Sequence, residues 1–432
     1  MPRIVLATFG SLGDLHPYLA LGVELRRRGH EVVVATHGIY RERATAAGLE
    51  FAAIRPDFDS FGDPMEFIRR AMDDKRGSVV VVRELVTPFL RASCSDLLGA
   101  CQGADLIVDH MLTFTASLVA EKLGIPRVSC TLQPVATFST YDPSIMPAAP
   151  FMTWLSRCGR WPWQLLWALG RVSTRHWFHE LEVLRREMGL PSSRRHPLLD
   201  HASDRLHLVL FSRELMAPQP DWPTAARQTG FPVHDRGESG AGLPPALARW
   251  LDAGPPPLVF TLGSSAVWAA GSFYDEAALA ARALGERAVL MTGIQDLNPV
   301  AGIPRVDDAP LDAAVVTVDY APHSEVMPRG LATIHQGGVG TTAQALLAGR
   351  PMLVVPFSHD QPDNAARCAR LGVARVLPRS RIGAAAFTRE LRLLIADREA
   401  EKRAQQVAAR MRTEPGAAGA VDAIERVLAA RG

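Results

Sequence analysis

The sequence predicts an α/β protein with two doubly wound domains of similar size. Short apolar segments alternate with helical segments through both halves of the 432 residues. Each half opens on a strand that is followed by a glycine turn, and a stretch rich in proline and glycine separates the halves. Because ligands of such sheets bind beyond the carboxyl ends of the strands, we expect the site in a cleft between the two domains.

The first half begins with the strand RIVLAT and the glycine turn FGSLGD. A helix is predicted over PYLALGVELRRRG, with His16 as its N-cap, Pro17 at its first position and Gly29 at its C-terminal cap. The segments EVVVAT, ADLIVDHM and PRVSCT are predicted as strands, apolar almost throughout as in a parallel sheet. These elements predict a first domain over residues 1–215.

The composition changes after residue 215. Residues 216–257 are rich in proline and glycine and lack periodicity, so we interpret them as a linker. Strands then resume with PLVFTLGSS, AVLMTG, VVTVDY, LATIHQGG and PMLVVPF, which predict a second domain over residues 258–410. The segment GAAGAVDAIERVLAARG predicts a C-terminal helix within residues 411–432.

Residues 151–178 interrupt the first half. They hold five of the eight tryptophans together with several arginines. One interpretation is a buried helical pair whose arginine stems reach to the surface. Another is a lipophilic wall of an acceptor site, or a patch for peripheral contact with a membrane surface. Composition alone does not decide between them.

Composition and charge exclude several classes of partner and environment. The net charge is +2 and no basic run with interleaved aromatics occurs, so nucleic acid is not an expected partner. The five cysteines are scattered and form no CxxC pair, which favours a reducing, cytoplasmic location over a disulfide framework. The apolar start is interpreted as a strand and not as a signal peptide. No segment reaches the roughly 18 apolar residues of a membrane-spanning helix.

Two glycine turns in the second half are predicted to hold phosphates. HQGGVGTT lies between a strand and a helix, whose first N–H groups and positive dipole end suit an anion. LGSS is a second turn of this kind. The alternative is a tight turn with no ligand. The candidate diphosphate-binding residues are Ser264, Ser265, His335, Gly337, Gly338, Gly340, Thr341 and Thr342, with Gly13 added from the first half.

A carboxylate and an amide stand side by side after the strand PMLVVPF. Together Asp360 and Gln361 accept and donate hydrogen bonds in fixed directions, which suits sugar hydroxyls. The alternative is a cap for the next helix. Neither GxGxxG with a downstream acid nor a P-loop is present, so a dinucleotide fingerprint is not supported.

The stretch from Tyr320 to Gly372 resembles the donor-binding signature of nucleotide-sugar glycosyltransferases of the GT-B fold, family 1 type. That fold has two Rossmann-like domains facing an interdomain cleft. The family includes plant and bacterial natural-product glycosyltransferases, sterol glucosyltransferases and rhamnosyltransferases. The N-terminal GSLGDLHPYLALGVELRRRGHEVVVAT resembles the bacterial and sterol branches, so the similarity covers both halves.

The resemblance implies a role for each matching residue of the donor signature. An aromatic residue at Tyr320 stacks on the nucleotide base, and His323 stands where plant members have glutamine. His335 contacts the diphosphate, and the turn that donates to it contains Gly340 and Thr341. Asp360 and Gln361 hold the sugar hydroxyls. The co-substrate implied is a nucleoside diphosphate sugar, with no other cofactor.

One position departs from the plant pattern. Plant members carry a glutamate that grips the ribose hydroxyls, whereas this chain has Ala343 there, followed by Gln344. UDP-glucose is the donor that the family favours. The missing ribose clamp keeps a dTDP sugar as the alternative.

The resemblance also locates the base that deprotonates the acceptor. Plant relatives use the histidine of a GHxxP turn; here the turn is GDLHP, so Asp14 takes that place and His16 is the alternative. An aspartate base works best when it is partly desolvated. Asp109 matches the acid that orients the plant histidine. It would act on Asp14 by like-charge proximity, contact the acceptor or support His110.

Taken together, these features predict an inverting glycosyltransferase that needs no metal. It would move a sugar to a hydroxyl of a lipophilic small molecule such as a polyketide, flavonoid, sterol or hydroxy lipid. The DFD at 57–59 is interpreted as a solvated loop and not as a metal site. The alternatives are a nucleotide-sugar epimerase on the same fold and an inactive auxiliary subunit of a glycosyltransferase.

Overall fold

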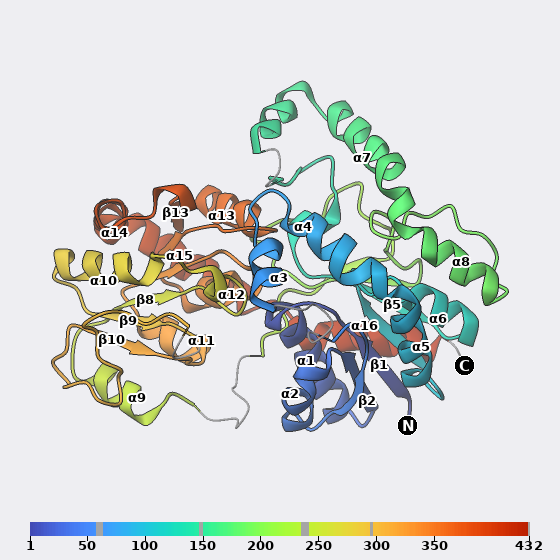
Figure 1. Cartoon of the computed structure of the whole chain (residues 1–432), viewed down its shortest axis with the longest axis horizontal. Helices are drawn as coiled ribbons and strands as arrows, with labels where there is room; N and C mark the ends of the chain where they lie inside the picture. Colours follow the sequence, from blue (N-terminus) through green and yellow to red (C-terminus); the bar gives the residue numbers. More distant parts are fainter. Residues whose placement is uncertain (58–63, 147–149, 235–241, 294–296, 431–432) are drawn as a thin grey trace. The chain divides into compact units, whose positions relative to one another are not determined.

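A computed structural model describes residues 1–430 apart from 58–63, 147–149, 235–241 and 294–296 (Figure 1). The chain forms two compact units. Unit 1 consists of Met1–Ala71, Lys75–His234 and Glu414–Gly432, and unit 2 consists of Met72–Asp74 and Asp235–Thr413. Each unit has its own parallel sheet, so the predicted class of two doubly wound α/β domains is confirmed.

Unit 1 contains a seven-stranded sheet in the order β3-β2-β1-β4-β5-β6-β7, in which every neighbouring pair is parallel. The strand order reverses between β1 and β4, which is where sheets of this kind bind ligands. The strands are β1 (Arg3–Ala7), β2 (Glu31–Thr36), β3 (Glu50–Ala53), β4 (Leu106–His110), β5 (Arg127–Thr131), β6 (Leu206–Val209) and β7 (Ala226–Gln228).

Helices cover both faces of this sheet because its strands are apolar on both sides. The first and last helices, α1 and α16, pack on one face, and α5, α6 and α8 pack on the other. The helices of unit 1 are α1 (Leu12–Arg27), α2 (Arg41–Ala46), α3 (Pro64–Ala71), α4 (Gly77–Val80), α5 (Leu90–Ala100), α6 (Ala116–Leu123), α7 (Trp161–Thr174), α8 (His179–Glu187) and α16 (Gly416–Ala429).

Unit 2 contains a six-stranded sheet in the order β10-β9-β8-β11-β12-β13, again parallel, with its reversal between β8 and β11. Its strands are β8 (Leu258–Thr261), β9 (Ala288–Met291), β10 (Val315–Val318), β11 (Ala332–His335), β12 (Met352–Val354) and β13 (Ala374–Val376). Its helices are α9 (Pro245–Asp252), α10 (Phe273–Leu284), α11 (His323–Val326), α12 (Val339–Ala348), α13 (Gln361–Arg370), α14 (Ala384–Ala396) and α15 (Arg398–Met411).

Two predicted boundaries need correction. The expected linker 216–257 contains β7 and α9, and the division between the units falls after His234. β7 has only three residues at a sheet edge, too few to show the alternation that identifies a strand. The C-terminal helix 411–432 is also not a separate part, because the chain returns to unit 1 at Glu414.

The return of the chain to unit 1 rests on specific contacts. Glu414 accepts hydrogen bonds from the Ser212 hydroxyl and the Arg213 N–H, each at 2.9 Å. Beyond it, α16 lies beside α1 (Figure 1), and its apolar side, including Val421 and Ile424, is buried in the same core as α1. Helix α16 therefore completes the hydrophobic core of unit 1.

Residues 151–178 do not form the buried helical pair that was one interpretation. They contain α7, whose inner side packs through Trp163, while its outer side is largely exposed. None of the helices in the described part of the chain is both long and apolar enough to cross a membrane.

Candidate functional site

The turn after β1 starts α1 with a capping box. Ser11 is the N-cap, and Asp14 Oδ2 accepts its N–H at 2.7 Å and its hydroxyl at 3.1 Å, while the Gly13 N–H donates to Ser11 Oγ at 3.2 Å. The predicted helix start, with His16 as N-cap and Pro17 first, is therefore wrong. Ser11 followed three residues later by an acid already caps the helix, which leaves Pro17 inside it.

The Asp14 side chain packs against Gly10, and any other residue at position 10 would force the Asp14 carboxylate to move. Gly10 has a φ of +133°, and a Cβ at that position would lie 2.3 Å from Asp14 Oδ2. The turn thus holds one carboxylate oxygen firmly. The other oxygen, Oδ1, lies outside these bonds, and the side chain is 23% exposed.

His110, at the end of β4, faces Asp14. Its Nε2 lies 3.6 Å from Asp14 Oδ1, and its ring is buried and packs edge-on against Tyr18. Neither ring nitrogen has a hydrogen-bond partner among the described residues. Burial lowers the pKa of His110, against opposing contributions from the Asp14 carboxylate and the Phe9 backbone. A neutral imidazole therefore stands beside the aspartate.

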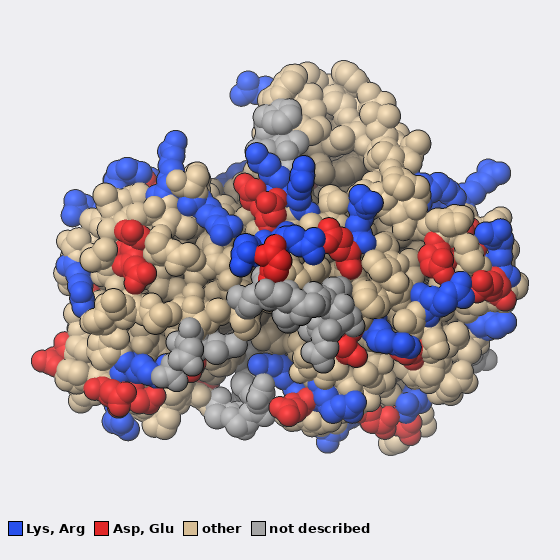
Figure 2. All heavy atoms as spheres, viewed as in Figure 1, with Lys and Arg blue, Asp and Glu red and all other residues tan. Residues whose placement is uncertain are grey.

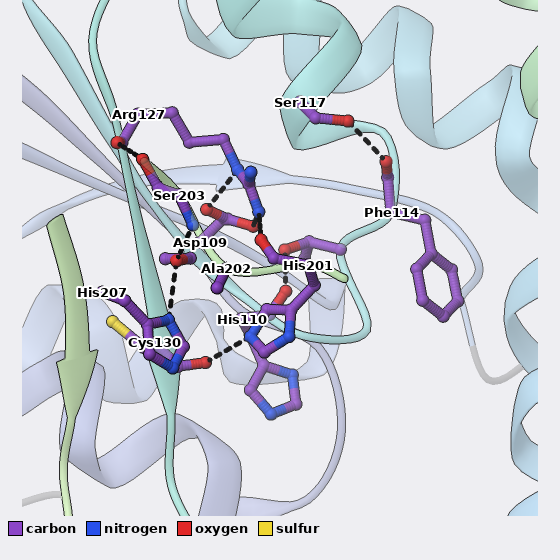
Figure 3. A network of polar contacts seen from close by, with 12 residues as sticks. Asp109, His110, Phe114, Ser117, Arg127, Cys130, His201, Ala202, Ser203 and His207 are labelled. Atoms are coloured by element: carbon purple, nitrogen blue, oxygen red, sulfur yellow. Dashed lines mark hydrogen bonds and ion pairs between the residues drawn. The ribbon is translucent and has the colours of Figure 1, made fainter. Parts of the chain in front are cut away.

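Asp109 does not face Asp14, although it is next to His110 in sequence. Consecutive residues of a strand point to opposite faces, so Asp109 lies on the face away from α1. There it pairs with Arg127 from β5, at 2.8 Å between Nε and Oδ1 and 3.1 Å between Nη2 and Oδ2 (Figure 3). Burial raises the pKa of Asp109 to about 6, despite the opposing charge of Arg127. The expectation that the Asp109 carboxylate acts on Asp14 by like-charge proximity is thus wrong.

The pair belongs to a buried polar network across β4, β5 and β6 (Figure 3). His207 bridges the hydroxyls of Ser129, at 2.8 Å, and Thr131, at 3.0 Å. The Arg127 guanidinium also donates to the carbonyl of His201. The network ties the segment before β6 to the sheet, which is a structural function.

His16 points elsewhere. It lies two residues after Asp14, so the two side chains are about 200° apart around the helix axis. Its ring is partly exposed and lies 5.9 Å from the ring of His234. The geometry therefore gives Asp14 and His16 different surroundings: Asp14 faces His110 of β4, and the His16 ring lies near that of His234.

In unit 2, the two glycine turns meet at the point where the strand order reverses. A Cβ on Gly263, which follows β8, would lie 2.4 Å from Gln336 Nε2 and 3.1 Å from Thr341 Oγ1, both beyond β11. Gln336 Nε2 donates to Thr341 Oγ1 at 3.2 Å. The turns that the sequence identified separately thus form one surface at the start of α12.

This surface presents polar atoms that the described residues do not satisfy. Gln336 Oε1 and Thr342 Oγ1 are buried without a hydrogen-bond partner. Gly338 is the N-cap of α12 and has no side chain to cap it, so the first N–H groups of the helix lack intrahelical partners. Gly340 and Thr341 lie in that first turn. The Thr342 hydroxyl and these N–H groups are donors and, with the positive end of the helix dipole, suit a phosphate group, whereas Gln336 Oε1 can only accept.

His335 is a buried residue that holds the glycine turn by a hydrogen bond. Its ring is fully buried, Nδ1 accepts the Gly337 N–H at 3.1 Å, and Nε2 lies 3.4 Å from Met352 Sδ. Burial, with a smaller contribution from His323, lowers the pKa of His335 to about 3, so the ring is neutral. Here the histidine braces the glycine turn, and its contact with a phosphate stays a prediction.

Asp360 and Gln361 are connected to the same turn. Asp360 stands at the N-cap position of α13 but makes no cap bond; its Oδ2 accepts from Asn364 Nδ2 at 2.7 Å. The same amide donates to the Gly337 carbonyl at 2.9 Å. Gln361 Oε1 accepts the N–H groups of the two residues at 357 and 358. This leaves the Gln361 amide nitrogen for a ligand.

The remaining predicted donor residues of unit 2 also lie beyond the strands of its sheet. Tyr320 follows β10 and is 42% exposed, so part of its ring faces solvent. His323, its neighbour, approaches Thr261 at the end of β8, with 3.4 Å between Nε2 and Oγ1. Ser264 and Ser265 lie half-buried in the turn after β8. The carboxyl ends of β8, β10, β11 and β12 thus bring together the predicted residues of unit 2, whereas Gly13 lies in α1 of unit 1.

Sequence reasoning left two residues without a role of their own. His110 was considered only as a residue that Asp109 might support, although the alternation of β4 places it on the α1 face with Leu106 and Val108. Gln336 lies inside the glycine motif and was not singled out. Its contact with Gly263 depends on two turns that are far apart in sequence.

The DFD segment lies only partly within the described residues. Asp57 Oδ1 accepts the Gly38 N–H at 3.3 Å, whereas Phe58 and Asp59 lie outside them. Among the described residues no three His, Cys, Asp or Glu side chains gather as metal ligands would. That transfer needs no metal remains a prediction.

Comparison with known proteins identifies both halves of the chain. The model of the erythromycin biosynthesis protein CIII-like C-terminal domain matches residues 301–427, and the glycosyltransferase family 28 N-terminal domain matches residues 4–138. O-mycaminosyltylonolide 6-deoxyallosyltransferase of Streptomyces fradiae is 31% identical over 98% of this chain and 97% of its own length. A sterol 3-beta-glucosyltransferase of Neurospora crassa is 28% identical over 99% of this chain but only 27% of its own length.

Solved structures agree on the fold. The glycosyltransferase of kitacinnamycin superposes with a TM-score of 0.69 at 23% identity, covering 99% of this chain and 100% of that one. The glycosyltransferase VinC in complex with dTDP superposes with a TM-score of 0.67 at 19% identity, covering both chains completely. The chain therefore belongs to the GT-B glycosyltransferases of family 1 type, the group that includes Streptomyces natural-product glycosyltransferases and sterol glucosyltransferases.

Proposed function

We propose that this glycosyltransferase takes a sugar from a nucleoside diphosphate sugar and transfers it to a hydroxyl of a lipophilic small molecule, with inversion and without a metal. The observation that carries the proposal is the junction of the two glycine turns at the start of α12, where the Thr342 hydroxyl is buried without a partner and the N-cap Gly338 has no side chain to satisfy the first N–H groups. Backbone N–H groups and hydroxyls there would stabilise the charge that develops on a leaving diphosphate.

The nucleotide of the donor is proposed from one position. Ala343 is buried in α12, and no carboxylate stands there to accept from ribose hydroxyls. A site without that carboxylate loses little binding energy when the nucleotide is a deoxyribonucleotide without a 2′-hydroxyl. The dTDP bound to VinC also supports a thymidine diphosphate sugar as a donor beside UDP-glucose.

Asp14 is the proposed base, with His110 as its positioning residue. One oxygen of Asp14 is held by Ser11, so the carboxylate has a fixed orientation. Oδ1 would accept the proton of the acceptor hydroxyl while the hydroxyl oxygen of the acceptor attacks the anomeric carbon. His110, neutral because it is buried, can donate Nε2–H to Oδ1; the present 3.6 Å would shorten in the complex. Attack from the face opposite the diphosphate inverts the anomeric centre.

A donor panel tests the function. The protein is incubated with UDP-glucose or dTDP sugars and a mixture of sterol, polyketide and phenolic alcohols, with and without EDTA, and conjugates are identified by mass spectrometry. We expect a β-linked conjugate from an α-linked donor, unaffected by EDTA. An isomerised donor without any conjugate would support an epimerase, and loss of transfer in EDTA would disprove the metal-free mechanism.

Two variants test the base. Asp14→Asn should reduce turnover by about 100-fold or more while donor affinity stays nearly unchanged, because general-base catalysis contributes on this scale. His16→Asn is the matched control on the same helix and should retain most of the activity. If His16→Asn lost more turnover than Asp14→Asn, His16 would be the base.

A further inference from the structure

Helix α7 exposes an apolar stripe along its outer side. Its exposed residues include Trp161, Leu165, Ala168, Leu169 and Val172, which follow one another at helical spacing. Trp161 is 62% exposed and Val172 is 79% exposed. These five residues are called the α7 stripe below. Because a helix that is apolar on both sides is normally covered on both sides, the stripe needs a partner.

The opposite side of α7 holds the helix in place. Trp163 is buried and its indole N–H donates to Ser156 Oγ at 3.2 Å. The Trp167 ring packs edge-on against Phe138, with 5.2 Å between centroids. The stripe is therefore displayed by a packed helix of unit 1.

The stripe differs from the other exposed apolar side chains of the chain. Elsewhere among the described residues, no helix or strand carries more than one large exposed hydrophobic side chain; Leu279 in α10 and Leu393 in α14 are examples. Single residues of this kind are normal on a protein surface, whereas a contiguous group marks an interaction.

The charged residues of the segment that carries the stripe have a single sign. From Pro143 to His179 the sequence contains four arginines and no Asp or Glu. Arg157 and Arg160 precede α7, and neither takes part in an ion pair among the described residues, although the Arg160 guanidinium lies over the Tyr141 ring, 4.2 Å from its centroid. Arg171 is paired with Asp200. Over α7, Figure 2 shows tan atoms with no red among them. An apolar strip with two cations at one end that have no carboxylate partner among the described residues is complementary to an anionic surface with an apolar interior.

We infer that the α7 stripe lies on an anionic lipid bilayer, in the plane of its interface. Trp161, Leu165, Leu169 and Val172 would enter the boundary between head groups and acyl chains, while Arg157 and Arg160 reach lipid phosphates. A protein partner fits less well, because protein interfaces carry hydrogen bonds throughout and the exposed side of α7 offers only Gln164 and Ser173 for them. This inference is independent of the proposed sugar transfer.

Vesicle sedimentation with the full chain tests it. Sucrose-loaded vesicles of phosphatidylcholine alone are compared with vesicles containing one-third phosphatidylglycerol. We expect binding to the anionic vesicles that weakens with salt and little binding to the neutral ones. Leu165→Asp with Leu169→Asp should weaken binding by about 25-fold, since each removes a half-exposed leucine from the interface. Arg157→Gln should weaken it by about fivefold.

The chain offers a matched control for these substitutions. Leu279 and Leu165 are both helical leucines and both 52% exposed, so Leu279→Asp should leave vesicle binding unchanged. Melting curves establish that each variant is folded. In addition, brominated acyl chains should quench the tryptophan fluorescence of the unsubstituted protein, a readout that needs no variant.

Three results would overturn the inference. The first is unchanged vesicle binding by the Leu165→Asp, Leu169→Asp variant, and the second is equal loss of binding by Leu279→Asp. The third is the absence of vesicle binding together with a dimer in solution that the double variant converts to a monomer; the stripe would then be an interface between two copies of the chain.

Discussion

Replacing His207 by asparagine is expected to reduce the acid sensitivity of unit 1. His207 is buried on β6 between the Ser129 and Thr131 hydroxyls. Burial, helped by the nearby Arg127 charge, lowers its pKa from the ordinary value of 6.5 to about 4. Between these values the unfolded chain binds a proton that the folded chain does not. Stability is therefore complete above pH 6.5 and falls as the pH drops towards 4.

The size of the effect follows from the two pKa values. With 6.5 in the unfolded chain and about 4 in the folded one, lowering the pH from roughly 7.5 to 5 costs about 2 kcal/mol of unfolding free energy through His207 alone. Asparagine does not titrate, so the variant should lose about 2 kcal/mol less than the wild type over this interval. His201, whose pKa burial also lowers, keeps some acid sensitivity in both proteins.

Urea unfolding followed by tryptophan fluorescence at the two pH values measures the difference. The probe suits unit 1, because six of the eight tryptophans lie there. The exposed His179 on α8 supplies the control, and His179→Asn should behave as the wild type. If His207→Asn and the wild type lose the same free energy between the two pH values, the reasoning from burial is refuted.

The other predictions concern catalysis, packing and the C-terminal return. His110→Gln should lower kcat about tenfold or more and leave the KM for the donor unchanged in steady-state kinetics; a change in donor KM alone would contradict its role beside Asp14. Arg367→Met should destabilise unit 2 by about 3–5 kcal/mol in urea unfolding, because it removes the guanidinium 2.7 Å from the buried Asp363 carboxylate, and adding Asp363→Leu should restore most of the loss. Ending the chain at Thr413 should lower the thermal midpoint of unit 1 and leave that of unit 2 unchanged, because α16 buries Val421 and Ile424 in the unit 1 core. An equal thermal midpoint of unit 1 with and without α16 would contradict this.

Several elements were predictable because their signals are local. The strands now seen as β1, β2, β4 and β5 are short apolar runs, and the same holds for β8 to β12. The glycine turn before α12 could be recognised for the same reason, because Gly337 has a φ of +88° and a Cβ there would lie 2.8 Å from Val354. Because only glycine satisfies such a backbone requirement, the residue type itself indicates the turn.

The start of α1 shows how a local signal can be misread. Pro17 is a good first helical residue, and choosing it moved the predicted N-cap to His16. Ser11 and Asp14 carry the competing signal, a capping box, and the structure follows it. Both signals were present in the sequence; the hydrogen bonds of Ser11 and Asp14 decide between them.

The sequence by itself determined the fold class, the family and the glycine turns, because periodicity and backbone conformation depend on near neighbours in the chain. Only the tertiary structure decided that His110 and not Asp109 faces Asp14, that Gln336 joins two turns, and that α16 completes unit 1. These facts depend on which face of a strand a side chain occupies and on which distant segment packs there. Such choices are made by the burial of the whole core and not by any short stretch of the chain.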